Sequence, residues 1–249
     1  MDLSARLIRI KERISAAALE SGRNPAEITL IAVSKTHPFD LVVQAAHLGQ
    51  THFGESYIQE ALPKLDAMQS EKGLDITQKN NIVWHFIGHL QSRKAKDAAG
   101  RFNLIHTVDS PRLAQALHKR MEQLAASDLQ TAFVNNLAQD VLIQVNIGQE
   151  GQKSGATQAD LPALIEQVLE LPRLNLKGLM CIPPFGDKPE TARPHFAHLR
   201  ELRDELEGKF GKGLLPHLSM GMSQDFEIAI AEGATLVRVG TDIFGERIY

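Results

Sequence analysis

The sequence has little of what marks secreted, membrane and nucleic-acid-binding proteins. It contains one cysteine, Cys181, so no disulfide can form within the chain. No apolar run approaches the roughly 20 residues that a membrane-spanning helix needs, and the amphipathic N-terminal stretch lacks the apolar centre of a signal peptide. The formal net charge of −3 gives no overall attraction to nucleic acid or to an anionic membrane. We therefore expect a cytoplasmic protein that binds small molecules.

The composition is that of a folded globular protein. Hydrophobic residues make up 43% of the sequence and charged residues 23%, which is enough apolar side chain for a large core. The 249 residues could form two small domains or one barrel of about 250 residues. No linker or low-complexity tract divides the chain, so we expect a single domain over residues 1–249.

Short apolar runs alternate with longer amphipathic stretches. The runs cover residues 28–35, 51–56, 82–88, 103–109, 141–148, 176–183, 215–221 and 235–245. Strands that are apolar on both faces, each followed by a helix, predict a parallel sheet covered by helices. Eight such units favour a closed (β/α)8 barrel over an open sheet.

The repeat is irregular at its ends and at one connection. Little sequence follows the last run, so we expect the usual closing helix to be missing. An amphipathic stretch precedes the first run, and we expect this N-terminal helix to fill the gap. Residues 127–139 form a longer connection whose structure the sequence does not define.

Polar and small residues close the apolar runs, where the active sites of such barrels are built. They are Lys35, Glu55, Ser56, Gly88, His89, Gln91, Asp109, Asn146, Pro183, Ser219, Arg238, Gly240 and Thr241. Loops are polar in most proteins, so the general pattern is weak support for a site. Lys35 and Arg238 are stronger indications, because loop polarity does not explain them easily.

Lys35 directly follows the apolar run ITLIAVS and is expected at the barrel mouth, with its stem among apolar side chains. Burial disfavours a charged ammonium, and the neutral amine can attack an aldehyde to form a Schiff base. The alternative is a lysine whose ammonium reaches water along an extended stem. The spacing by itself leaves both interpretations open.

Small residues follow the seventh and eighth runs. Ser219, Gly221 and Ser223 lead into an amphipathic helix, whose N-terminus can bind an anion. Gly240 allows close backbone approach and Thr241 offers a hydroxyl. These two loops are the usual phosphate site of the fold, although a simple capped turn has similar residues. A lysine opposite a phosphate site favours the Schiff-base interpretation.

Two other features are interpreted as structural. His85 and His89 are four residues apart, but on a strand this spacing separates them by about 13 Å, so they do not form a helical metal pair. Cys181 has apolar neighbours and is expected in the core rather than as a nucleophile. We predict no metal site.

Seven stretches stand out in order along the chain: IAVSKTHP, FGESYIQEA, WHFIGHLQSRKAK, VNIGQEGQKSG, GLMCIPP, LSMGMSQDFEIAI and VRVGTDIFG. Together they resemble the landmarks of the YggS/PROSC family of pyridoxal-phosphate homeostasis proteins. The resemblance covers nearly the whole chain. It implies a barrel like the N-terminal domain of alanine racemase, with an extra N-terminal helix, that binds pyridoxal 5′-phosphate (PLP) as a Schiff base.

The resemblance also implies roles for particular residues. The residues expected to bind PLP are Lys35, Asn146, Ser219, Gly221, Arg238, Gly240 and Thr241. Lys35 matches the Schiff-base lysine, and Arg238 matches the partner of the ring nitrogen. Ser219, Gly240 and Thr241 match phosphate contacts, and Asn146 is expected beside the cofactor.

Two positions depart from the family pattern. The loop after the third run has His89 where the family usually has Pro or a similar small residue, and Arg93 where it usually has Asn. Arg93 adds a positive charge near the barrel mouth. The departure affects the ligand contacts expected of this loop, but not the Schiff base.

The resemblance implies a binding protein rather than an enzyme, one that holds, buffers or transfers PLP, with PLP-dependent enzymes as candidate recipients. Separately, we expect a monomer. Arg238 fits this role, because a guanidinium only donates hydrogen bonds and cannot keep the ring nitrogen protonated. The alternatives are an amino-acid racemase, a Schiff-base aldolase without cofactor, and an interaction protein. Racemisation needs a second base, which related barrels take from an additional domain and a partner subunit, and a chain ending at Tyr249 leaves no length for that domain.

Overall fold

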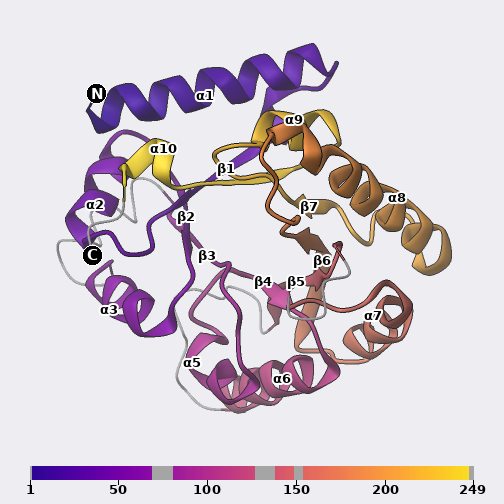
Figure 1. Ribbon diagram of the computed structural model, residues 1–249. Coiled ribbons are helices and arrows are strands. Elements are labelled where there is room, and N and C mark those ends of the chain that lie inside the picture. Colours follow the sequence, from indigo (N-terminus) through magenta and orange to yellow (C-terminus); the bar gives the residue numbers. More distant parts are fainter. Residues whose placement is uncertain (1, 69–80, 127–137, 149–153, 247–249) are drawn as a thin grey trace.

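The structure is a computed structural model that describes residues 2–68, 81–126, 138–148 and 154–246. Within these ranges, eight parallel strands pair in chain order and close into a barrel, with β1 paired to both β2 and β8 (Figure 1). The strands are β1 (Thr29–Val33), β2 (His52–Glu55), β3 (Val83–Phe86), β4 (Leu104–Val108), β5 (Gln139–Val145), β6 (Leu174–Cys181), β7 (His217–Ser219) and β8 (Leu236–Val239). The (β/α)8 barrel predicted from the sequence is confirmed.

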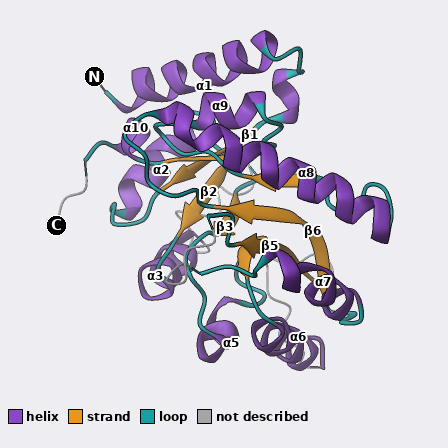
Figure 2. Ribbon diagram, turned by 45° about the vertical axis from the view of Figure 1, so that its right-hand side comes forward, coloured by secondary structure: helices purple, strands orange, loops and turns teal. Residues whose placement is uncertain are grey.

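Helices surround the barrel (Figures 1 and 2). In the described part of the chain they are α1 (Leu3–Glu20), α2 (Phe39–His47), α3 (Ile58–Met68), α5 (Ala95–Ala98), α6 (Pro111–Ala126), α7 (Leu161–Leu169), α8 (Arg193–Phe210), α9 (Phe226–Ala231) and α10 (Thr241–Phe244). Short 3₁₀ turns are η1 (Pro25–Glu27), η2 (Ser92–Lys94), η3 (Gln158–Asp160) and η4 (Pro189–Ala192). No helix of these described ranges has the length and apolar character needed to cross a membrane.

Alternate residues of each strand face the inside of the barrel, because successive side chains of a strand point to opposite faces. Ile31, Leu104, Leu142, Met180 and Leu236 form a small apolar cluster there. The larger apolar core lies between the strands and the helices. The barrel is therefore a packed core rather than a pore.

The N-terminal helix covers the barrel where the repeat ends. α1 packs against α9 and α10, which confirms that it fills the gap expected there (Figure 1). Arg13 of α1 donates hydrogen bonds to Glu227 of α9 at 2.6 Å and to Asp242 of α10 at 3.0 Å. These bonds tie α1 to the helices that follow β7 and β8.

The last strand is shorter than predicted. β8 ends at Val239, and Thr241–Phe244 forms α10 instead of continuing the strand. The full-length closing helix is therefore replaced by the four-residue α10, and α1 covers this end of the barrel. Asp242 lies in the first turn of α10, where an acidic side chain favours the start of a helix. Most of the connection at 127–139 lies outside the described residues.

Candidate functional site

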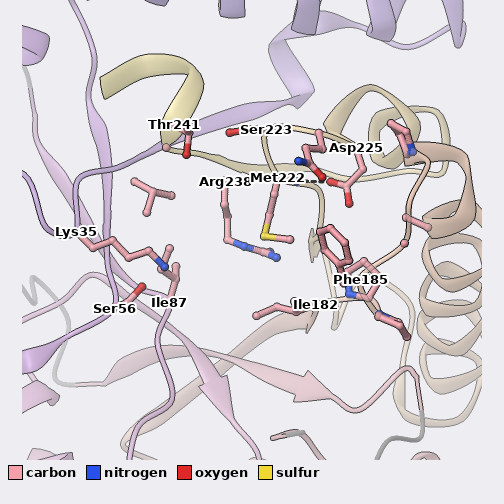
Figure 3. A pocket seen from close by; sticks show the side chains of 18 of the residues that line it. Lys35, Ser56, Ile87, Ile182, Phe185, Met222, Ser223, Asp225, Arg238 and Thr241 are labelled. Carbon is pink, nitrogen blue, oxygen red and sulfur yellow. Dashed lines mark hydrogen bonds between the residues drawn. The ribbon is translucent and has the colours of Figure 1, made fainter. Parts of the chain in front are cut away.

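A cavity of about 490 Å³ opens at the carboxyl ends of the strands. Its wall includes residues at or after the ends of β1, β2, β3, β6 and β8, and the loop after β7 (Figure 3). Small-molecule sites usually measure about 300–1,000 Å³. The barrel is therefore hollowed in the place where this fold holds its ligands.

Lys35 lies in the turn after β1, and its side chain points into the cavity (Figure 3). The next residue, Thr36, has a backbone angle φ of +65°. A β-branched residue at positive φ is strained, and the Thr36 N–H donates to the Glu60 carboxylate at 3.0 Å. This hydrogen bond helps to hold the turn in the conformation that presents the Lys35 amine.

Arg238 faces the same cavity from β8, the strand that pairs with β1 (Figure 3). It is only 4% exposed, and burial lowers its pKa from the ordinary value. A guanidinium still keeps its proton in proteins, so Arg238 remains a hydrogen-bond donor. Its Nη1 donates to Ser219 Oγ at 2.6 Å and its Nη2 to the Cys181 carbonyl at 2.9 Å. Burial raises the pKa of the Cys181 thiol to about 12, so this residue contributes a carbonyl and not a nucleophile.

Ser223, Gly240 and Thr241 line another part of the cavity wall, and Ser223 and Thr241 lie on the same side of Arg238 (Figure 3). Because α10 begins at Thr241, the N–H groups of Thr241 and Asp242 are not used by its own hydrogen bonds, whereas those of Ile243 and Phe244 donate to Gly240. A Cβ atom at Gly240 would lie 3.3 Å from the Val33 carbonyl oxygen, so a larger residue fits poorly. Hydroxyls and N–H groups in this arrangement suit a phosphate.

The turn that carries Ser223 is shaped by its neighbours. The Met222 N–H donates to the Asp225 carboxylate at 2.6 Å. Gly221 has a φ of +91°, and a Cβ there would lie 2.6 Å from the Cβ of Ala229. Gly221 therefore sets the path of the chain over α9 and is not among the described residues that line the cavity.

The cavity brings together part of the predicted set, namely Lys35, Arg238, Gly240 and Thr241. Ser219 is fully buried below the cavity, because β7 ends there and the chain reaches the rim only after the turn at Gly221. Asn146 follows β5 and lies outside the lining. Ser223, from the same small-residue stretch as Ser219, lines the cavity wall, and so does Ser56 after β2.

Histidines occupy the barrel interior below the cavity. Nδ1 of His52 lies 2.9 Å from Nε2 of His85, and Nδ1 of His85 lies 2.9 Å from Nε2 of His106. Nδ1 of His106 lies 2.9 Å from Ser219 Oγ. Burial holds the pKa of His85 and His106 well below the usual value of 6.5, so both rings are neutral.

These low pKa values predict a loss of stability in acid. Below pH 6.5 the two histidines take up protons in the unfolded chain but not in the folded one. Each therefore lowers the free energy of unfolding by up to about 1.4 kcal/mol per pH unit as the pH falls. Urea unfolding between about pH 7.5 and about pH 5 measures this slope, the change in the free energy of unfolding per pH unit. We expect His85→Gln to reduce this slope and the surface variant His198→Gln to leave it unchanged; equal slopes in all three proteins would contradict the assignment.

A buried ion pair supports the turn of Lys35. Lys64 Nζ donates to Glu55 Oε1 at 2.7 Å and to the Ser34 carbonyl at 2.8 Å. Ser34 Oγ donates to the same carboxylate oxygen at 2.7 Å. Burial raises the pKa of Glu55, although Lys64 opposes the shift. The pair joins Ser34, which lies between the end of β1 and Lys35, to β2 and α3.

The loop that departs from the family pattern lines a second cavity. His89 and Arg93, together with Asp109 and Arg112, surround a volume of about 430 Å³. Arg93 Nε donates to Gln91 Oε1 at 2.7 Å. Neither His89 nor Arg93 lines the Lys35 cavity, so the extra positive charge lies beside the site rather than within it.

The chain matches a known class of (β/α)8 barrel. Residues 7–248 match the family described as alanine racemase, N-terminal domain. The chain is 45% identical over 249 residues to the pyridoxal phosphate homeostasis protein of Aquifex aeolicus (strain VF5), with 100% of each chain covered. It is 43% identical over 251 residues to the protein of the same name from Escherichia coli (strain K12), covering 100% of this chain and 98% of that one.

A solved structure shows the same likeness. PipY of Synechococcus elongatus PCC7942, with PLP bound, has a TM-score of 0.78 and 34% sequence identity, covering 98% of this chain and 100% of PipY. The chain belongs to the pyridoxal phosphate homeostasis protein family, as the sequence resemblance implies.

Proposed function

We propose that this protein binds PLP through Lys35 and acts in PLP homeostasis, holding the cofactor for delivery to PLP-dependent enzymes. One observation carries the proposal: a single cavity is lined by an amine, a buried guanidinium and a rim of small hydroxyl residues. The names of the Aquifex and Escherichia relatives and the PLP bound to PipY support the same ligand.

The lining residues fit each functional group of PLP. The Lys35 amine suits the aldehyde, with which it would condense to a Schiff base with release of water. Ser223, Thr241 and the N–H groups at the start of α10 suit the phosphate. Arg238 lies deeper on β8 than Gly240 and suits the ring nitrogen, which accepts a hydrogen bond.

Arg238 also favours a binding protein over an enzyme. Bound PLP supplies an electron sink, and this sink is strong when the ring nitrogen is protonated. Arg238 would donate a hydrogen bond to that nitrogen and would so keep it unprotonated. We therefore propose that the protein carries out no catalytic turnover, which separates it from an amino-acid racemase.

The site is also suited to the uptake and release of PLP by a single chain. Phe185, on the cavity rim, is 86% exposed, so the mouth is open to solvent. We propose that a monomer takes up and releases PLP through this mouth.

Loss of either rim hydroxyl should weaken PLP binding without preventing Schiff-base formation. Ser223→Ala and Thr241→Val each remove one hydrogen bond to a charged phosphate, worth about 1.5–3 kcal/mol, or about 10- to 100-fold in affinity. Equilibrium dialysis measures the change. Ser92→Ala, at the second cavity, should bind as the wild type does. Pyridoxal, which lacks the phosphate, should bind all variants equally; equal losses for PLP and pyridoxal would contradict a phosphate rim.

The absorbance spectrum of the purified protein before and after borohydride tests the function. We expect a visible band that borohydride removes, and a reduced peptide that contains Lys35. A band without modification of Lys35 would contradict the site, and no band after incubation with PLP would favour an aldolase or an interaction protein. Interconversion of L- and D-alanine at an enzymatic rate would favour the racemase.

A further inference from the structure

A continuous row of hydrogen-bonded side chains runs through the barrel to the cavity. It starts at His52, which is partly buried at the first position of β2, and passes through His85 of β3 and His106 of β4. It then reaches Ser219 of β7 and ends at Arg238 of β8. The row therefore links the amino-terminal end of the barrel to the floor of the PLP site.

The cavity end of the row fixes the direction of its hydrogen bonds. Arg238 can only donate, so Ser219 Oγ accepts at 2.6 Å. The hydroxyl hydrogen of Ser219 then points to Nδ1 of His106, at 2.9 Å. A neutral imidazole that accepts at Nδ1 carries its hydrogen on Nε2 and donates from there. His106 therefore donates to His85, and His85 donates to His52 by the same rule.

The opposite direction is unfavourable. It would make Ser219 Oγ accept from both His106 and Arg238, and would turn its own hydrogen away from both partners in a fully buried position. The low pKa of His85 and His106 keeps both rings neutral, so that each has one donor and one acceptor. One serine hydroxyl therefore sets the tautomers of the whole row.

We propose that His106 and Ser219, supported by His85 and His52, are positioning residues that hold the Arg238 guanidinium against the ring nitrogen of PLP. This inference rests on the proposed function, because it requires the pyridine ring to lie next to Arg238. An arginine side chain loses much rotamer freedom when it is held in one place. Ser219 and the Cys181 carbonyl hold Arg238, and His106 in turn orients Ser219.

The direction of the hydrogen bonds along the row can be measured without any ligand. NMR of the PLP-free protein labelled with ¹⁵N-histidine distinguishes protonated from unprotonated ring nitrogens. We expect His52, His85 and His106 to be neutral, with the hydrogen on Nε2. A hydrogen on Nδ1 of His106 in the wild type would contradict the inferred direction of the hydrogen bonds.

The positioning role is tested with two ligands, PLP and an analogue in which a carbon replaces the ring nitrogen. His106→Gln should weaken PLP binding about tenfold or more, since the hydrogen bond from Arg238 is misaligned, and should leave the analogue unaffected. His217→Gln is the matched control, because His217 lies in the same barrel next to Thr235, outside the row. It should change the binding of neither ligand. Ser219→Ala, which removes a single oxygen, should reproduce the effect of His106→Gln and replaces it if that variant does not fold.

Other results would overturn the positioning role of His106 and Ser219. Equal losses for PLP and the analogue in His106→Gln would show that the row only maintains the fold, and so would equal losses in His106→Gln and His217→Gln. A wild-type protein that binds neither ligand would overturn the proposed function and the positioning role together. The tautomers measured in the PLP-free protein would still decide the direction of the row.

Discussion

Lys35→Ala is expected to abolish the visible absorbance band of the PLP-loaded protein and to leave no site that borohydride can trap. The reason is chemical: the variant lacks the amine that condenses with the aldehyde, whereas the phosphate rim and Arg238 remain. The side chain points into the cavity rather than into the core, so the midpoint of thermal unfolding of the PLP-free protein should change little (Figure 3). Absorbance, calorimetry and mass spectrometry after reduction measure these effects.

Lys188→Ala provides the matched control, because Lys188 is a second lysine in the same cavity wall. It is exposed, unlike the half-buried Lys35. We expect this variant to keep the band and the borohydride-modified peptide. An unchanged spectrum in Lys35→Ala, or a lost band in Lys188→Ala with Lys35 intact, would show that the assignment to Lys35 is incorrect.

The barrel could be predicted because each strand is buried on both faces and therefore reads as a nearly continuous apolar run. The boundary of β8 could not be predicted in the same way. Ile243 and Phe244 follow the strand closely enough to be taken as part of it, although Thr241 and Asp242 are polar and Thr241–Phe244 forms a helix. Short apolar runs suit a strand or a buried helix equally well, so their periodicity does not decide between the two.

Site residues could be predicted from the sequence where they lie at or near the end of a strand, as Lys35 and Arg238 do. Ser219 and Ser223 show the limit. Both are small residues in one stretch, and which of them reaches the rim depends on the turn at Gly221, where φ is +91°. The row through His85 and His106 could not be predicted from spacing either, because its members come from different strands and meet only inside the closed barrel.

The buried pair of Glu55 and Lys64 was also missed, since Lys64 lies in a helix that reads as an ordinary amphipathic segment. Lys64→Met is expected to reduce the free energy of unfolding by about 3–5 kcal/mol, because it leaves a buried carboxylate without its counter-charge. Glu55 is fully buried and its pKa is already raised by burial. Without Lys64 the folded carboxyl should bind its proton still more tightly than the unfolded one, so the deficit should shrink as the pH is lowered toward the acid range.

Urea unfolding of the PLP-free protein at two pH values measures this deficit. Lys209→Met provides the surface control, because Lys209 pairs with Glu166 at 3.2 Å with both side chains more than half exposed, at 54% and 57%. Exposed pairs contribute only about 0–1 kcal/mol, so this variant should be nearly as stable as the wild type. The double variant Lys64→Met with Glu55→Gln should recover part of the loss, since it removes the unpaired charge. If Lys64→Met cost no more than Lys209→Met, the buried pair would not be what secures the end of β1 beneath Lys35.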